Sequence, residues 1–371
     1  MAENRKRRRV DPNEPTCLMA PQERRAVIAL SNARKPFPKI IEQTENDDFA
    51  VYQGDCIRVI EGLPPSCVHY SIFSPPFASL YSYTDATEDH SNVRDYAEFF
   101  IGFDFTVQKL AHVLIPGRLV SFHCMNLPAT LERDGYTGIK DFRGDLIRAF
   151  QRHGFIYHSE VVIWKDPLIA ATRTHAQGLA HQQIVKDSAL CRQGIPDYLV
   201  TMRKPGKNPE PVTHPYGFSR WIGPSEREPK ALKRSDPAIN KYSHYVWQNY
   251  ASPVWFDIDP GDTLQKKSAR DDDDSRHICP LQLTVIRRAV ELWSNPGDIV
   301  LSPYAGIGSE GYVSLQEGRR FVGAELKDTY YRQAVANLSR AIEDRPQPGL
   351  DLQPTPTTEP TEDTQDAIRD R

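Results

Sequence analysis

The sequence predicts an α/β fold, that is, a sheet covered by helices. Short apolar runs alternate with segments of helical period, and this pattern occurs in two separate blocks of the chain. A stretch rich in Pro, Gly, Trp and Tyr separates the blocks and shows little periodicity. With 371 residues, the chain can hold one such sheet, an insert and two flexible ends. We therefore expect one α/β domain whose two parts are distant in sequence.

The first block, residues 48–166, is expected to form the first half of this domain. Gly and Pro mark where its helices stop, because Pro cannot continue a helix and Gly favours the conformation that follows one. The elements expected in order are a strand at 68–73, a helix at 96–114 ended by Pro116-Gly117, a strand at 118–124, a helix at 141–153 ended by Gly154, and a long strand at 155–164.

The second block, residues 277–345, is shorter and has the same alternation. Its expected elements are a helix at 281–293 stopped by Asn295-Pro296-Gly297, a strand at 299–301, a helix after Gly308, a strand at 321–324 and a helix at 328–342.

The rest of the chain divides into two ends and an insert. Residues 1–47 form a lead-in that opens with a basic arm, and residues 346–371 form an acidic tail rich in Pro and Thr. A tail of this composition cannot bury enough apolar area to fold, so we expect it to be disordered. Residues 167–276 are predicted to be an inserted module.

The net charge of −3, from 46 Lys and Arg against 49 Asp and Glu, excludes a chain that is basic throughout. Its distribution is uneven, because residues 203–241 carry nine basic side chains against four acidic ones and are interleaved with aromatic residues. Phosphates attract cations and bases stack on aromatic rings, so this segment suits a nucleic-acid surface, although a solvated loop would show the same composition. The DNA-binding candidates are Arg203, Lys204, Lys207, Arg220, Lys230, Lys233 and Arg234.

Composition also excludes two other classes of protein. No apolar run is long enough for a membrane span, and the N-terminus carries charge where a signal peptide has an apolar region, so we expect a cytoplasmic protein. The six cysteines are scattered without a Cys-x-x-Cys pair, and we therefore expect neither a disulfide framework nor a metal site.

A glycine loop follows the strand expected at 299–301. Gly306, Gly308 and Gly311 have G-x-G-x-x-G spacing, and Glu325 ends the next strand, where a carboxylate can bind a ribose diol. Either a dinucleotide or S-adenosylmethionine (AdoMet) would suit such a loop. The position of the loop near the C-terminus favours AdoMet, as does Glu310, whose charge would repel a pyrophosphate.

A stiff turn, Ser74-Pro75-Pro76-Phe77, follows the strand expected at 68–73. The two prolines fix φ and supply no N–H groups, so the turn is rich in hydrogen-bond acceptors. The Ser74 hydroxyl and the Pro75 carbonyl could accept the two hydrogens of an exocyclic amino group, and Phe77 could stack on the ring that bears it. This arrangement would aim the nitrogen lone pair at an electrophilic methyl group.

The order of these motifs resembles the β-type amino-methyltransferases of DNA, which act on cytosine N4 or adenine N6. In that family the catalytic turn comes before the target-recognition region and the AdoMet loop comes after it. The resemblance covers roughly residues 48–338. It implies a Rossmann-like AdoMet-dependent methyltransferase sheet with permuted motif order, an inserted target-recognition region, AdoMet as the methyl donor and double-stranded DNA as the partner.

The resemblance also implies roles for individual residues. Ser74, Pro75, Pro76 and Phe77 match the catalytic turn, and Asp55 matches the acidic residue that contacts the adenine of AdoMet. Residues expected to bind other parts of AdoMet are His277, Pro280, Ser302, Tyr304, Gly306, Gly308 and Glu325.

Two positions depart from the family pattern. Ser302 stands where Asp is frequent and Tyr304 replaces the usual Phe, so the departures concern the methionine end of AdoMet and not the adenosine. Ser74 resembles the cytosine-N4 group more than the adenine-N6 group. Methylation of cytosine C5 is disfavoured because it needs a nucleophilic thiolate, found in that family as Pro-Cys, and no cysteine here follows a proline.

Two other functions stay open on the sequence. A chain of this fold could bind DNA without turnover, or the glycine loop could serve a nicotinamide-dependent oxidoreductase, which would leave the Ser74 turn unexplained. The resemblance also implies a cognate restriction enzyme as a further possible partner.

Overall fold

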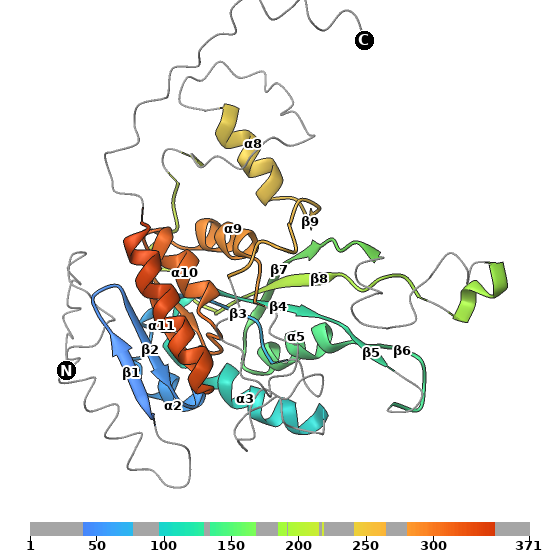
Figure 1. Ribbon diagram of the computed structural model, residues 1–371, viewed down its shortest axis with the longest axis horizontal. Coiled ribbons are helices and arrows are strands. Elements are labelled where there is room, and N and C mark those ends of the chain that lie inside the picture. Colours follow the sequence, from blue (N-terminus) through green and yellow to red (C-terminus); the bar gives the residue numbers. More distant parts are fainter. Residues whose placement is uncertain are drawn as a thin grey trace, which may run out of the picture.

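The computed structural model describes residues 40–76, 96–129, 134–167, 185–190, 192–214, 217–218, 241–264 and 280–345. Within these residues the chain forms one large sheet of nine strands, in the order β1-β2-β11-β10-β3-β4-β8-β7-β9 (Figure 1). The strands are β1 Glu42–Glu45, β2 Phe49–Gln53, β3 Val68–Phe73, β4 Leu114–Met125, β7 Ile156–Ile163, β8 Asp197–Arg203, β9 Val254–Trp255, β10 Ile299–Ser302 and β11 Arg320–Glu325.

Strand direction decides where functional side chains can meet. β2, β11, β10, β3, β4, β7 and β9 run the same way, whereas β1 and β8 run against their neighbours. Every residue of β3 is buried, as expected for a central strand covered on both faces. The carboxyl ends of seven strands therefore share one edge, the usual place for ligand sites in open α/β sheets.

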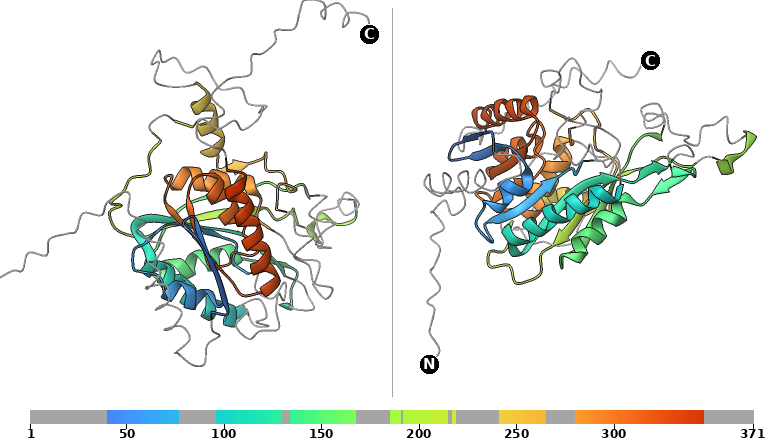
Figure 2. Two further views of the ribbon diagram at one scale, coloured as in Figure 1. Left: turned by 60° about the vertical axis from the view of Figure 1, so that its left-hand side comes forward. Right: turned by 90° about the horizontal axis from the view of Figure 1, so that it is seen from below.

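Helices cover both faces of the sheet (Figure 2). One core cluster joins the sheet to the first three helices of the described chain, and a second cluster joins its other face to the last three. The first group is α2 Cys56–Glu61, α3 Tyr96–Val113 and α5 Phe142–Arg152, and the second is α9 Leu283–Trp293, α10 Ser309–Gln316 and α11 Asp328–Glu343. The expected α/β fold of helix and sheet layers is confirmed.

The ten elements expected from the sequence are all present; β3 has the expected bounds, and most of the others have shifted ends. The largest difference is at β4, which begins at Leu114 directly after α3 and continues through Pro116-Gly117. Gly117 has a φ of +78°, and the pairing of β4 with β3 is irregular beside it. The Pro-Gly pair thus marks an irregularity within a strand. The helix ends at Val113, one residue before its expected end, whereas the expected start of the strand at 118 is wrong.

Part of the range 167–276 belongs to the sheet. β8 lies between β4 and β7 and is antiparallel to both, and β9 pairs with β7 at the sheet edge. The same range holds a 3-10 turn, η1 Ser188–Leu190, and the helix α8 Lys241–Tyr250. Outside this range, β5 Leu127–Ala129 and β6 Gly138–Lys140 form a separate two-stranded sheet. The sequence pattern did not predict β8 or β9. The other domain boundaries stay predictions, and the basic arm and the acidic tail lie outside the described residues.

Among the helices that the structure describes, none combines the length and the apolar composition needed to cross a bilayer.

Candidate active site

Four adjacent strands bring the predicted site residues to one edge of the sheet. Asp55 lies just beyond β2, Glu325 ends β11, Ser302 ends β10, and Ser74 follows β3. Because β2, β11, β10 and β3 are neighbours and parallel, these four residues lie along one edge of the sheet although 270 positions separate Asp55 from Glu325. The structure thus places the Ser74 turn and the glycine loop at the same edge of the sheet, on the paired strands β3 and β10.

Asp55 is fixed by the helix that follows it. Its Oδ1 accepts hydrogen bonds from the N–H groups of Ile57 (2.7 Å) and Arg58 (3.4 Å), so it caps the N-terminus of α2. The neighbouring Gly54 N–H donates to the Glu325 carbonyl at 2.9 Å. The turn after β2 is therefore tied to the end of β11, where a ribose-binding carboxylate is expected.

The glycine loop needs left-handed backbone at two positions. Gly306 has a φ of +54° and Gly308 a φ of +84°, a region that favours glycine over other residues. The Gly306 N–H donates to Glu325 Oε2 at 2.8 Å, and the Lys327 N–H donates to Oε1 at 2.9 Å. One carboxylate thus holds both the loop after β10 and the turn after β11.

Tyr304 connects the loop to the catalytic turn. Its ring packs edge-to-face on Phe73, with centroids 5.7 Å apart, and its hydroxyl lies 3.2 Å from Thr106 Oγ1 on α3. The hydroxyl that distinguishes Tyr304 from the family's Phe therefore has a hydrogen-bond partner. Phe73 directly precedes Ser74, so a shift of the loop at Tyr304 would also displace the turn.

Two observations in the loop fit a bound polar ligand. Ser302 is fully buried and its Oγ has no hydrogen-bond partner among the described residues. A Cβ added at Gly306 would meet nothing within 4 Å. A buried hydroxyl without a partner costs free energy, and a ligand beside the open backbone of Gly306 would supply that partner.

Glu310, in the first turn of α10, is buried, and burial raises its pKa to about 8. The carboxyl group therefore keeps its proton near neutral pH. The expectation that a charge on Glu310 repels a pyrophosphate is wrong for this reason, and it no longer helps to discriminate between AdoMet and a dinucleotide.

The catalytic turn contacts a residue that the sequence did not single out. Ser74 Oγ lies 3.2 Å from Nδ1 of His123 on β4, and His123 Nε2 lies 3.1 Å from Oδ2 of the buried Asp197. Asp197 Oδ1 accepts a hydrogen bond from Lys165 at 2.6 Å. No sequence signal links His123 to the turn, because its partner Asp197 begins β8, a strand that the sequence pattern did not predict.

Other predicted residues fall elsewhere. Pro75 is buried and Pro76 half-buried beside Ser74, and Pro280 lies half-buried ahead of α9, whereas Phe77 and His277 are outside the described residues. β8 begins at Asp197 near the Ser74 turn and ends at Arg203, which pairs with Leu119 and Ile156 at the far edge of the sheet. Lys204 and Lys207 follow Arg203 beyond that edge. The structure therefore does not bring these three to the catalytic turn. The remaining DNA-binding candidates, Arg220, Lys230, Lys233 and Arg234, are outside the described residues.

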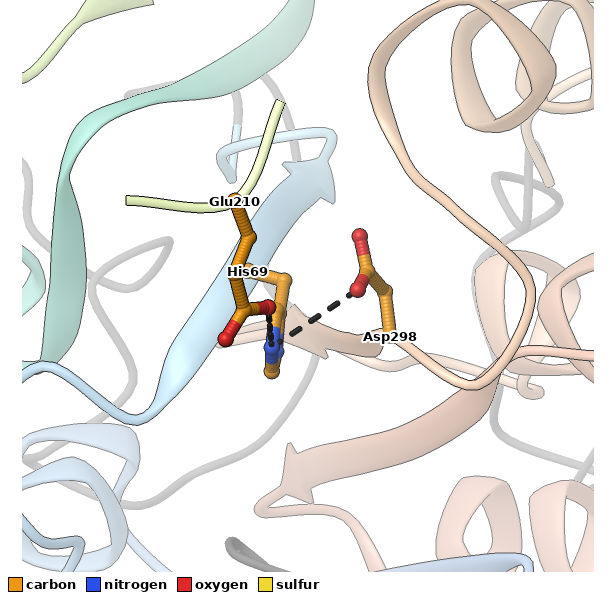
Figure 3. Close-up of side chains that lie close together, drawn as sticks. All are labelled: His69, Glu210 and Asp298. Atoms are coloured by element: carbon orange, nitrogen blue, oxygen red, sulfur yellow. Dashed lines mark ion pairs between the residues drawn. The ribbon is translucent and has the colours of Figure 1, made fainter. Parts of the chain in front are cut away.

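A second polar cluster lies at that far edge. His69 Nε2 is 3.6 Å from Asp298 Oδ1 and 3.7 Å from Glu210 Oε2, close enough for the three side chains to be considered as metal ligands (Figure 3). His69 Nδ1, however, accepts the Ile299 N–H at 3.1 Å. The imidazole proton then belongs on Nε2, facing the carboxylates, where a metal would need a lone pair. Arg118 also pairs with Asp298. We therefore assign the cluster as a polar clamp that holds residues 204–210 to the sheet.

Comparisons with known proteins agree with this architecture. Residues 68–336 match the family model described as DNA methylase. The DNA adenine methyltransferase YhdJ of Escherichia coli is 39% identical over 57 residues, which cover 15% of this chain and 19% of YhdJ. The type II methyltransferase M.Cfr9I of Citrobacter freundii is 39% identical over 62 residues, 17% of this chain and 21% of that protein. Such alignments span less than a third of the curated relatives.

Two solved structures show the same fold at low sequence identity. TTHA0409 of Thermus thermophilus, a DNA modification methylase by its description, was crystallised with S-adenosyl-L-methionine; it has a TM-score of 0.51, 19% identity, and coverage of 81% of this chain and 96% of its own. The cytosine-N4-specific PvuII DNA methyltransferase has a TM-score of 0.50 and 13% identity, and the match covers 80% of this chain and 92% of that protein. Because the family model spans more than half of the sequence, the chain belongs to the N6/N4 DNA methylase family.

Proposed function

We propose that the protein transfers a methyl group from AdoMet to the exocyclic amino group of a base in double-stranded DNA. One observation carries the proposal. The acceptor-rich turn at Ser74 follows β3, which pairs directly with β10, the strand that leads into the glycine loop. The Phe73–Tyr304 ring contact joins the ends of the two strands. A base at the turn and a cofactor at the loop would therefore be neighbours.

The residues at the loop suit the parts of AdoMet. Glu325 offers a carboxylate to the ribose diol, Asp55 lies near the place expected for the adenine, and Ser302 has an unused hydroxyl nearby. His277 and Pro280 are proposed to meet the methionine end. When bound, AdoMet supplies an electrophilic methyl group on a sulfonium centre.

The turn supplies positioning without a covalent intermediate. Ser74 Oγ and the Pro75 carbonyl accept the two hydrogens of the amino group, which draws its lone pair out of conjugation with the ring. Phe77 stacks on that ring. Such a group is paired and stacked within duplex DNA, so the proposal includes flipping of the target base into this site.

Exposed aromatic residues occur at the same edge of the sheet. Trp164 and Phe256 follow the paired strands β7 and β9 and are 46% and 57% exposed. The Trp164 N–H donates to the Trp255 carbonyl at 3.1 Å, which places the two exposed rings on adjacent strands. We propose that this edge faces DNA, together with the basic side chains of Arg220, Lys230, Lys233 and Arg234, whereas Arg203, Lys204 and Lys207 lie toward the far edge.

Ser rather than Asp at position 74 supports cytosine N4 over adenine N6 as the target, by a narrow margin. The resemblance to type II methyltransferases supports a cognate restriction enzyme as a partner. Neither alternative changes the chemistry proposed at the turn.

The test is expression in a host that lacks DNA methylation, followed by single-molecule sequencing of the host DNA and mass spectrometry of its nucleosides. We expect N4-methylcytosine at one short sequence motif. N6-methyladenine instead would keep the amino-methyltransferase proposal and overturn the preference for cytosine.

Ser74→Ala is the informative variant. It should bind AdoMet like the wild type and transfer methyl groups at least about 10²-fold more slowly, because the amino group loses an oriented acceptor. Ser188→Ala, at an exposed serine of η1, is the matched control. Absence of methylated DNA with the wild-type protein, or unchanged transfer by Ser74→Ala, contradicts the proposal.

A further inference from the structure

Ser74 is the first member of a chain of polar contacts that leads into the sheet. Its Oγ lies 3.2 Å from His123 Nδ1, and His123 Nε2 lies 3.1 Å from Asp197 Oδ2, an ion-pair contact that falls short of hydrogen-bond geometry. The other oxygen of Asp197 accepts from Lys165 Nζ at 2.6 Å. The four side chains come from the turn after β3, from β4, from β8 and from the segment after β7.

The sheet register explains why these side chains meet. His123 of β4 is paired with Leu199 of β8, and Asp197 lies two residues from Leu199 on the same face. His123 is therefore the diagonal neighbour of Asp197. Both lie near the carboxyl end of β4, on the edge where Ser74 follows the adjacent β3.

Asp197 is 3% exposed and carries its charge inside the protein. Burial alone would raise the pKa of this carboxyl group, but the contacts with His123 and Lys165 outweigh burial and lower the pKa. Asp197 is thus a carboxylate that faces Nε2 of His123. A buried carboxylate in this position favours the imidazole tautomer with its proton on Nε2.

That tautomer determines how Ser74 can bind a substrate. With the proton on Nε2, the Nδ1 atom of His123 has a lone pair and accepts the Ser74 O–H. The serine hydrogen is then occupied, and its oxygen lone pairs are available to an amino group. With the opposite tautomer, His123 would donate to Ser74, and the serine hydrogen would compete with the amino hydrogens.

We propose that His123, held by Asp197, is a positioning residue that makes Ser74 a hydrogen-bond acceptor and takes up the proton lost by the target amino group. This inference rests on the proposed function. It adds two residues, distant in sequence from the Ser74 turn, to the apparatus for amino-group methylation.

The proton balance of the step is complete with these groups. Transfer forms an N–CH₃ bond, breaks the S–CH₃ bond with its electron pair left on sulfur, and requires the nitrogen to lose one proton. That proton passes to Ser74 Oγ while the serine proton passes to His123 Nδ1. The resulting imidazolium lies beside the Asp197 carboxylate, which stabilises it, and returns its proton to water after the product leaves.

Asp197→Asn tests the proposal with the smallest change of shape. It removes the charge that selects the His123 tautomer, so single-turnover transfer from tritiated AdoMet should slow by about 10²-fold or more. Titration calorimetry should find AdoMet affinity unchanged. His123→Leu should have the same effect on the rate, whereas His123→Asn, which retains an acceptor near the Nδ1 position, should recover part of it.

The double variant Ser74→Ala/Asp197→Asn separates positioning from a general structural role. If Asp197 acts through Ser74, the double variant should transfer at the slow residual rate of Ser74→Ala, because the effects of groups that act as a unit do not add. A further slowing by the full factor seen in the wild-type background overturns the proposal. His158→Asn, at an exposed histidine of β7, is the matched control.

The remaining outcomes separate the relay from the proposed function. If the wild-type protein methylates DNA and both Asp197→Asn and His123→Leu transfer within about threefold of its rate, the proposed role of His123 and Asp197 (the relay) is wrong and the proposed function stands. A rate loss matched by an equal loss of AdoMet affinity shows a structural role and also overturns the relay. Both proposals fall if the wild-type protein places no label on DNA.

Discussion

Glu325 accepts a hydrogen bond at each carboxylate oxygen, and the bond to Oε2 comes from the backbone N–H of Gly306, 2.8 Å away. The bond to Oε1 comes from the Lys327 N–H at 2.9 Å. The residue expected to bind the ribose therefore also fixes the backbone of the loop beside it. Cofactor binding and loop geometry depend on the same side chain.

Glu325→Gln should weaken AdoMet binding for both reasons. The amide has only one acceptor oxygen, so either the Gly306 or the Lys327 N–H would face an NH₂ group. Hydrogen bonds to charged groups contribute about 1.5–3 kcal/mol, which corresponds to a rise in the AdoMet Kd of about 10- to 100-fold. Titration calorimetry measures the change, with Glu343→Gln, at an exposed position of α11, as the control. An unchanged Kd would contradict both roles of Glu325.

Gly306 and Gly308 should respond differently to alanine. Both have positive φ, so each substitution strains the backbone. At Gly308 the added Cβ would also lie 3.2 Å from Cα and Cβ of Ala334 on α11, whereas at Gly306 it would enter open space. Gly308→Ala should therefore cause the larger loss of folding stability, by about 1–3 kcal/mol.

For Gly306→Ala we expect the larger loss of AdoMet affinity, because its open space is where the ligand is proposed to lie. Chemical denaturation and calorimetry on both variants measure the two effects. Gly297→Ala controls for backbone strain alone, since Gly297 has a φ of +82° and open space at the far edge of the sheet. Equal losses of affinity in the two loop variants would argue against a ligand at Gly306.

The part of the fold that the sequence predicts well is the part with strong local signals. β3 is a short, mostly apolar segment that ends at the Ser74-Pro75-Pro76 turn, and α11 and β11 follow the glycine loop with clear periodicity, so their positions and order could be inferred. Ser74 and Glu325 could then be placed at strand ends, where α/β sheets bind ligands. This reasoning needs only the order of elements and the rule that parallel strands end at one edge.

The part of the fold that the sequence does not predict depends on pairing between strands that are distant in the sequence. β8 reads Asp-Tyr-Leu-Val-Thr-Met-Arg within a region of low periodicity, and only its contacts with β4 and β7 make it a central strand. Without β8, nothing places Asp197 beside His123. Its course along the sheet also carries Arg203, Lys204 and Lys207 to the edge away from Ser74, which composition alone could not show.

Glu310 should make folding stability depend on pH. Burial, together with the charge of Glu325, raises the pKa of Glu310 to about 8 from an ordinary value of 4.5. Between these values the folded protein binds a proton that the unfolded chain has released, so the free energy of unfolding falls as pH rises from about 4.5 to 8. Glu310→Gln removes this term.

The variant should therefore gain stability over the wild type as pH rises, by about 3 kcal/mol more at pH 8 than at pH 5. Chemical denaturation at both values measures the difference, with Glu343→Gln again as the control. A gain that is equal at the two pH values would show that Glu310 is ionised in the folded protein.

The two edges of the sheet should contribute unequally to DNA binding. Trp164 is 46% exposed at the edge that carries Ser74, whereas Lys207 is exposed at the opposite edge, beyond the end of β8. If DNA lies against the catalytic edge, Trp164→Ala removes a stacking face, and stacking contributes about 1–3 kcal/mol per base. The DNA Kd, measured by fluorescence anisotropy at fixed salt, should rise by about 5- to 100-fold.

Lys207→Ala should leave the DNA Kd within about twofold and the salt dependence of binding unchanged, because a lysine that meets no phosphate releases no counterion. The reverse result, in which Lys207→Ala lowers the salt slope by about one and Trp164→Ala has no effect, would move the DNA to the far edge. It would separate the DNA surface from Ser74 by the length of the central strands, a distance that no flipped base could span, and would count against methyl transfer at the Ser74 turn.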